Sequence, residues 1–254
     1  MARLCTLFPF QTTDKIPTMQ LETYYAEQAD TITFTRQQAS RFAKGVAGDF
    51  NPIHDVNNKR FCVPGDLLFS VVLHKVGLSQ QMHVNFSGMV ADNVPLQFDS
   101  HNGDKIIVKD EKGKAYLSVE RSGETSTDQT LINHLIRRYV EFSGQTFPHI
   151  LVPLMAQHDV MINPIRPLVI YESMTIDIKR FDISAPELVL ASSTLEAEGK
   201  RGTVRLGFNL ISEGKIVGQG EKRLVLSGLR PYDADKIERL AQDYAIRKES
   251  YPTD

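Results

Sequence analysis

Residues 63–78 read VPGDLLFSVVLHKVGL, and this stretch decides the fold. At helical spacing its apolar side chains point in nearly every direction around the helix axis: Leu67, Leu68, Phe69, Val71, Val72, Leu73 and Val76. A helix that is apolar all round is buried. Pro64 suits the first turn of such a helix, and Asp66 is electrostatically favourable near its N-terminus. The stretch therefore predicts a long, buried helix.

Strand-like segments follow this helix. Residues 84–91, 94–99, 105–110 and 115–122 are rich in β-branched and aromatic residues, and Asp, Asn and Gly separate them. One buried helix followed by several strands favours an antiparallel sheet wrapped around that helix. The expected fold class is therefore α+β.

The same order of elements then starts again. Residues 126–143 predict a helix with Ser126 or Thr127 as its N-cap, and four strand-like runs follow at 168–181, 187–199, 203–212 and 216–228. Aligning VAGD (46–49) with FSGQ (142–145) gives a repeat of about 96 residues, based on element order more than on identity.

The repeat predicts two domains and a tail. The first domain covers residues 1–125 and the second covers 126–229, with the seam in the polar segment 122–129. Residues 230–254 form a C-terminal helical segment. Its apolar face holds Ile237, Leu240, Ala241 and Tyr244.

The segment before the buried helix carries the candidate chemistry. Residues 33–47 predict a helix capped by Thr35, and residues 48–54 follow it as GDFNPIH. Gly48 permits a tight bend, and the Asn51-Pro52 pair excludes helix at Asn51. A short loop of this kind can hold Asp49 and His54 facing one space, where they would share a water as a general acid/base device. The alternative is that Asp49 caps a turn and His54 only packs.

GDFNPIH resembles the signature of the MaoC-like (R)-specific enoyl-CoA hydratases and dehydratases, which are hotdog-fold enzymes. The match covers Gly48, Asp49, Asn51, Pro52, Ile53 and His54, and PGDLLFS supplies Gly65, Leu67 and Ser70 where the family has its helix-start motif. The resemblance implies a double hotdog, in which two antiparallel sheets each wrap around a long helix.

The same resemblance implies a reaction and roles for the site residues. Water would be added or removed at C2–C3 of a 2-enoyl or 3-hydroxyacyl thioester carried on coenzyme A or acyl carrier protein, without metal or cofactor. Asp49 and His54 would activate the water, and the Gly65 N–H would bind the thioester oxygen as charge develops there. Asn51 would support the loop, and Ser70 would orient an acid/base residue.

The chain departs from the family pattern around the motif and in the second half. Only nine residues separate His54 from Pro64, about half the usual spacing, and Pro64 replaces a histidine before the helix glycine. In the second half Gln145 aligns with Asp49, and His149 and His158 do not fall at the spacing of His54. The second half is therefore expected to shape the acyl site rather than to carry chemistry.

Composition narrows the class of protein. The 254 residues carry a net charge of −2, with 29 Lys and Arg against 31 Asp and Glu, so nucleic acid is not an expected partner. Cys5 and Cys62 form no metal-ligand spacing and fit a reducing compartment. The N-terminal MARLCTLFPFQTTDK has too short an apolar run for an export signal, and no run suits a membrane span. A cytoplasmic protein is expected.

Two other functions remain open at this point. A carboxylate and a water also suffice to hydrolyse a thioester, so a hotdog acyl-CoA thioesterase is one alternative. A catalytically silent acyl-thioester-binding protein is the other, and the departures near the motif favour it. A separate bacterial family built on the same fold would inherit no substrate. Because hotdog proteins commonly dimerise, the resemblance also allows a homodimer.

Overall fold

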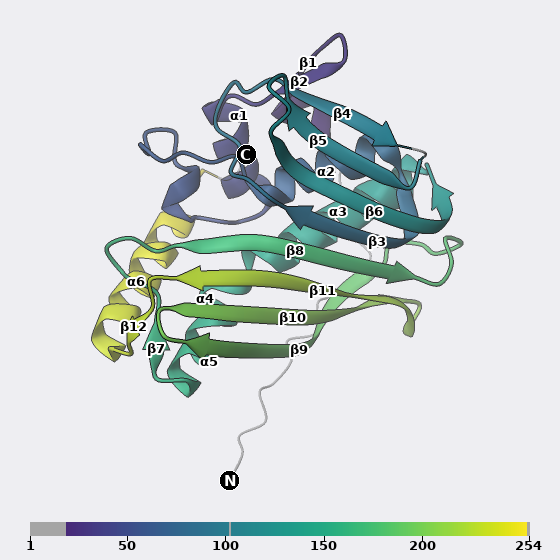
Figure 1. Ribbon diagram of the computed structural model, residues 1–254. Coiled ribbons are helices and arrows are strands. Elements are labelled where there is room, and N and C mark those ends of the chain that lie inside the picture. Colours follow the sequence, from purple (N-terminus) through teal and green to yellow (C-terminus); the bar gives the residue numbers. More distant parts are fainter. Residues whose placement is uncertain (1–18, 102, 253–254) are drawn as a thin grey trace.

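The computed structural model describes residues 19–101 and 103–252, and Cys5 and the N-terminal segment lie outside these ranges. A large antiparallel sheet dominates the structure, and the helices pack behind it and along one end (Figure 1). The α+β class expected from the sequence is confirmed. Within the described ranges, no helix is both long and apolar enough to cross a bilayer.

Ten strands hydrogen-bond into one sheet in the order β1-β2-β4-β5-β6-β3-β8-β11-β10-β9. The strands of the first half are β1 Ala26–Gln28, β2 Thr31–Thr33, β3 Leu78–Phe86, β4 Leu96–His101, β5 Lys105–Asp110 and β6 Ala115–Ser126. Those of the second half are β8 Val169–Ile178, β9 Glu187–Glu198, β10 Arg201–Ser212 and β11 Lys215–Ser227. The short strands β7 Val160–Met161 and β12 Arg230–Pro231 pair separately.

The strand order of the first half is repeated in the second. From the centre outward the order is β3-β6-β5-β4 on one side and β8-β11-β10-β9 on the other. The two halves meet where β3 pairs antiparallel with β8, in a register that places Val84 opposite Met174. Because β3 and β8 are hydrogen-bonded, the strands of the two halves form one continuous sheet (Figure 1).

The helices are α1 Arg36–Arg41, α2 Gly65–Val76, α3 Gln129–Gly144, α4 Thr146–His149, α5 Leu151–Gln157 and α6 Ala234–Glu249. The predicted buried helix is confirmed as α2, of which eight successive residues from Asp66 to Leu73 are buried. Helix α3 packs beside α2 against the sheet, and both helices contribute to one large apolar core. A smaller core lies between the outer strands of the second half, α5 and Ile237 of α6.

Several predicted element ends are wrong, among them those of β3 and α3. The strand predicted at 84–91 begins at Leu78 and ends at Phe86, because Gln81 to Val84 alternate exposed and buried despite their polar residues. The N-cap of α3 is Asp128, whose carboxylate accepts from Thr130 N at 2.8 Å. Ser126 is not the cap because it is still part of β6.

The predicted C-terminal helix is confirmed as α6, with Ile237 and Tyr244 buried. It begins after the N-cap Asp233, whose side chain accepts from Lys236 N. In Figure 1 this yellow helix runs from the outer strands of the second half back toward the N-terminal half. A segment nearly 200 residues away in sequence is thereby brought onto the GDFNPIH loop, as its hydrogen bond from Tyr244 to Gly48 shows.

Candidate functional site

The GDFNPIH loop follows helix α1, which has a well-defined N-cap and an irregular C-terminal end. Thr35 is the predicted N-cap of α1, and it forms a complete capping box with Gln38. After Arg41 the helix widens into a π-helix over Phe42–Val46, which the sequence did not predict. The chain then turns at Gly48 with φ +64°, and Asp49 N donates to Ala43 O at 2.7 Å. The bend ascribed to Gly48 is therefore present and delivers Asp49 to the loop.

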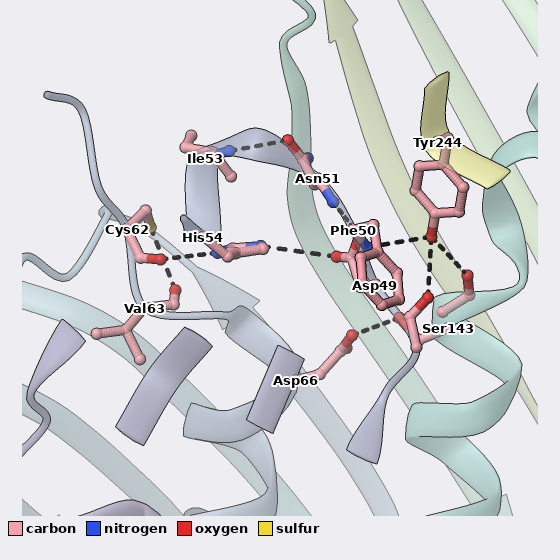
Figure 2. A network of polar contacts seen from close by, with 12 residues as sticks. Asp49, Phe50, Asn51, Ile53, His54, Cys62, Val63, Asp66, Ser143 and Tyr244 are labelled. Atoms are coloured by element: carbon pink, nitrogen blue, oxygen red, sulfur yellow. Dashed lines mark hydrogen bonds and ion pairs between the residues drawn. The ribbon is translucent and has the colours of Figure 1, made fainter. Parts of the chain in front are cut away.

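Asp49 and His54 face each other across this loop (Figure 2). His54 Nε2 lies 3.6 Å from Asp49 Oδ2. Asn51 N donates to the other carboxylate oxygen at 2.9 Å, and the Asn51 side chain caps the 3-10 helix Pro52–His54 by accepting from Ile53 N at 3.2 Å. Asn51 thus bonds Asp49 and caps the short helix that ends at His54.

The second nitrogen of His54 fixes the proton arrangement of the ring. Nδ1 lies 2.7 Å from the carbonyl oxygen of Cys62. A carbonyl only accepts, so Nδ1 carries a hydrogen, and in the neutral ring Nε2 presents its lone pair toward Asp49. The side chain of His54 is 11% exposed and that of Asp49 is 29% exposed. The pair can therefore hold a water molecule between a carboxylate and a proton-accepting nitrogen.

Basic side chains hold the short loop that follows His54. Arg36 donates to the carbonyls of Val56 and Asn58 at 3.0 and 2.9 Å. Lys44 pairs with Asp55 at 2.7 Å, and the Asn58 amide donates to Pro52 O at 2.6 Å. These hydrogen bonds and this ion pair hold the nine residues before Pro64 in place, which keeps the carbonyl of Cys62 next to His54 Nδ1.

Gly65 and Ser70 lie on α2, and of these two residues only Gly65 lines the same cavity as Asp49 and His54. Gly65 is the first residue of the helix, so its N–H has no acceptor within the helix. A Cβ at this position would lie 2.8 Å from the ring of Tyr171, so only glycine fits beneath that ring. Ser70 is fully buried, and its hydroxyl donates to the carbonyl of Asp66 at 2.6 Å, one turn earlier in α2. Ser70 therefore bonds its own helix and not Asp49 or His54.

The structure adds a buried polar cluster that sequence reasoning missed. Asp66 Oδ1 lies 3.3 Å from Lys222 Nζ, and the Ser143 hydroxyl donates to Asp66 and accepts from Lys222. Lys222 also lies 4.0 Å from the ring centroid of Tyr171. Burial and the Asp66 charge raise the pKa of Tyr171 well above its usual range. Asp66 thus has a buried cationic partner rather than only the helix dipole.

Tyr244 of α6 connects the two halves at this loop. Its hydroxyl accepts from Phe50 N at 3.2 Å and lies 3.0 Å from Gly48 O and 3.4 Å from Gly144 O, each of which can accept its proton (Figure 2). Burial, and next the charge of Asp49, raise the pKa of Tyr244, so its hydroxyl stays protonated and able to donate. The apolar face of 230–254 pointed to burial of Tyr244, but nothing local in the sequence indicated which loop it would contact.

Replacing Tyr244 by phenylalanine should lower the free energy of unfolding by about 1–3 kcal/mol, because the buried N–H of Phe50 loses its acceptor. The backbone on both sides of Asp49 would also lose its bonds to α6. Urea unfolding measures the loss of stability. Tyr251→Phe is the matched control, since the Tyr251 ring also contacts Phe50, with centroids 5.6 Å apart. Equal stability of the two variants would show that the Tyr244 hydroxyl does not hold the loop.

The pair, Gly65 and the polar cluster line one cavity of about 1050 Å³. Its walls are otherwise largely apolar, with Leu68, Phe86, Leu151, Ile162 and Leu224 among them. Lys59, Arg60 and Arg166 are exposed and also line it. This volume is ample for an extended small-molecule ligand. Convergent polar groups in an apolar cavity mark the default candidate for an active site.

The remaining candidates lie outside this cavity. Gln145, His149 and His158 are exposed and do not line it. His74, in the last turn of α2, does not line the cavity either, and its Nε2 lies 3.1 Å from a carboxylate oxygen of Glu22. Among the residues that the structure describes, no group of three or more His, Cys, Asp or Glu is placed to hold a metal ion.

The thiol of Cys62 should be nearly inert in the folded protein. Burial raises its pKa to about 11, so at pH ~8 only about one thiol in a thousand is ionised, roughly a hundredfold fewer than for a free cysteine near 9. Alkylation by iodoacetamide in a Cys5→Ser variant should therefore be at least about a hundredfold slower in the native state than in guanidinium chloride. Equal rates in the two states would show that Cys62 is open to solvent.

Comparisons with solved structures returned distant likenesses. An acyl-CoA thioesterase II, TesB2, from Mycobacterium marinum has a TM-score of 0.46 at 9% identity and covers 85% of this chain and 100% of its own. A MaoC-like dehydratase has a TM-score of 0.40 at 8% identity over 80% of this chain and 98% of its own. Peroxisomal multifunctional enzyme type 2 from Drosophila melanogaster has 0.41 at 12% identity, over 77% of this chain and 48% of its own.

Comparisons of sequence gave one family. No curated protein matched the chain significantly. A family model described as "Protein of unknown function (DUF3581)" matches residues 19–235, which include the pair, the polar cluster and every strand of the large sheet. The chain belongs to the DUF3581 family.

Proposed function

We propose that this protein is a double-hotdog hydratase or dehydratase of the MaoC type. Its reaction would add or remove water at C2–C3 of a 2-enoyl or 3-hydroxyacyl thioester. The observation that carries the proposal is the pair itself: His54 Nε2 faces Asp49 Oδ2 at 3.6 Å while Nδ1 is bound to Cys62 O. The strand order that the two halves share supports the double hotdog, with β3 and β8 at its centre.

The geometry suits a stepwise or concerted syn hydration. A water held between the two side chains gives one proton to His54 Nε2, and its oxygen forms a bond to C3. The electrons of the C2=C3 bond move toward the thioester carbonyl, whose oxygen gains negative charge. His54 then returns the proton to C2, so the atoms and charges balance. Throughout, the carboxylate of Asp49 accepts a hydrogen bond from the second O–H of the water, which stays on the oxygen, and it stabilises the protonated imidazole.

The thioester oxygen would meet the start of α2. The N–H of Gly65 is directed away from its own helix and lacks an acceptor there, and the positive end of the helix dipole favours negative charge at this point. The Asp66 carboxylate next to it would oppose that charge, but Lys222 neutralises it at 3.3 Å. The paired Lys222 therefore keeps the field at Gly65 favourable for the reaction.

The test is to follow crotonyl-CoA and a longer 2-enoyl-CoA by absorbance of the conjugated thioester. We expect loss of this absorbance with no release of free thiol, because water adds to C3 and the thioester remains intact. Release of free coenzyme A at the rate of absorbance loss would instead assign hydrolysis and a thioesterase. Binding of acyl-CoA with neither change would assign an acyl-thioester-binding protein.

A further inference from the structure

The polar cluster behind Gly65 is assembled from three distant parts of the chain. Asp66 comes from α2, Ser143 from α3 and Lys222 from β11, and each is 9% exposed or less. On β11 Lys222 is buried in phase with Leu224 and Leu226, so its side chain enters the interior and not the solvent. The cluster is thus a built feature of the interior.

This polar cluster lies next to the GDFNPIH loop. Ser143 precedes Gly144, where a Cβ would overlap the carbonyl oxygen of Ala47. Tyr244 bonds both Gly144 O and Gly48 O, and Gly48 precedes Asp49. The end of α3 is therefore packed directly on the backbone that carries Asp49. In Figure 2 the side chains of Ser143 and Asp66 lie just below Asp49.

The same cavity wall holds one more buried polar group. Thr146 is 6% exposed and lines the cavity with Asp66, Ser143 and Lys222. Its hydroxyl oxygen is buried and has no hydrogen-bond partner among the described residues. Burying a polar group without a partner is unfavourable, and an aliphatic acyl group placed against this wall would leave it so. Because this oxygen is buried, a ligand oxygen would reach it once the Thr146 side chain changes rotamer, and that hydrogen bond would relieve the cost.

We propose that Asp66, Ser143, Thr146 and Lys222 form a second binding site in this cavity, for a neutral oxygen-bearing group on the acyl part of the substrate. This inference rests on the proposed function. A hydroxyl can donate to Asp66 or Thr146 and accept from Thr146 or Lys222, while Ser143 holds Asp66 and Lys222 in place, and a carbonyl can use the two donors alone. Because the site adjoins the Asp49 backbone, the oxygen belongs close to the reacting carbons, on C4.

Charge decides between a hydroxyl and a carboxylate on C4. The cation of Lys222 already faces the anion of Asp66 at 3.3 Å. A substrate carboxylate would place two anions against one buried cation, which is unfavourable in a site shielded from water. A hydroxyl or carbonyl adds no charge. The preferred substrates are therefore acyl thioesters with a neutral oxygen on C4.

The test compares three 2-enoyl esters of coenzyme A that differ only at C4: crotonyl-CoA with a methyl, 4-hydroxycrotonyl-CoA with a hydroxymethyl, and fumaryl-CoA with a carboxylate. We expect kcat/KM for the hydroxymethyl ester to exceed that for the methyl ester by about tenfold or more, the effect of one hydrogen bond to a buried group. Fumaryl-CoA should be the poorest of the three. Equal rates for the first two, or a preference for fumaryl-CoA, would overturn the inference.

Variants separate this site from intrinsic differences between the esters. In Thr146→Val and in Ser143→Ala the hydroxymethyl-to-methyl ratio should fall by about tenfold, toward one. The matched control is Ser79→Ala, which removes a buried serine hydroxyl bonded to Thr125 outside the cavity and should keep the wild-type ratio. A ratio that stays at the wild-type value in both Thr146→Val and Ser143→Ala would overturn the site.

Binding of saturated esters distinguishes a failure of this inference from a failure of the proposed reaction. Calorimetry of the wild type with 4-hydroxybutyryl-CoA and butyryl-CoA needs no turnover. Tighter binding of the hydroxy ester supports the site even if no 2-enoyl ester is hydrated, a result that would reject the hydratase alone. Equal affinity for the two esters would overturn the site and leave the hydratase to its own assay.

Discussion

Replacing His54 by alanine should lower kcat/KM for hydration of crotonyl-CoA by about 10²–10⁴-fold, the usual contribution of a positioned general base. Without Nε2 the water keeps only the carboxylate of Asp49 and has no group to carry its proton to C2. Asp49→Asn should lose a similar factor, because an amide removes the charge that faces the imidazole across 3.6 Å. The double variant should be little worse than either single variant, since the two side chains act on one water.

The fold should survive these changes. The loop keeps its bonds from Arg36 to Val56 and Asn58 and from Asn58 to Pro52, none of which involves the pair. Circular dichroism and urea unfolding check this directly. His83→Ala is the matched control, because His83 is exposed on β3 outside the cavity. Full hydration activity in a folded His54→Ala protein would remove the pair from the mechanism.

The pair could be anticipated because its geometry is encoded locally. Gly48 with φ +64°, the Asn51 cap and the Pro52 ring determine the turn within seven residues, and this turn brings Asp49 and His54 face to face. The burial of helix α2 was equally predictable, since a helix with apolar residues on every side is buried in the protein interior. Features set by neighbouring residues were therefore visible in the sequence.

The polar cluster was not visible because its members meet only in the folded chain. Lys222 lies 156 residues from Asp66 in the sequence. Within GQGEKRLV it stands between the charged residues Glu221 and Arg223, a pattern that is typical of an exposed lysine. The one available signal was its phase with Leu224 and Leu226 on a strand. Tyr244 presents the same difficulty, since its contact with Gly48 spans 196 residues. The π-helix Phe42–Val46 was also missed, because its letters fit an ordinary helix.

The second large effect is expected at Lys222. Lys222→Met should lower the free energy of unfolding by about 3–5 kcal/mol, because it leaves the Asp66 carboxylate buried and opposed only by the Ser143 hydroxyl. Lys105→Met is the control, since Lys105 is half exposed and pairs with exposed Glu120 at 3.7 Å, an arrangement that contributes little to stability. Urea unfolding compares the two variants. A Lys222→Met protein as stable as Lys105→Met would show that Asp66 is not a buried anion.

A charge-balanced double variant extends this prediction to catalysis. Lys222→Met combined with Asp66→Leu removes both charges, so stability should return to within about 1–2 kcal/mol of the wild type, as for other buried pairs replaced by apolar residues. Hydration of crotonyl-CoA should fall most in the single variant, where an unopposed carboxylate next to Gly65 N–H repels the charge developing on the thioester oxygen. In the double variant that repulsion is absent, so crotonyl-CoA turnover should partly recover while the preference for a C4 hydroxyl is lost. Recovery of stability without any recovery of turnover would mean that Lys222 acts on the substrate itself and not through Asp66.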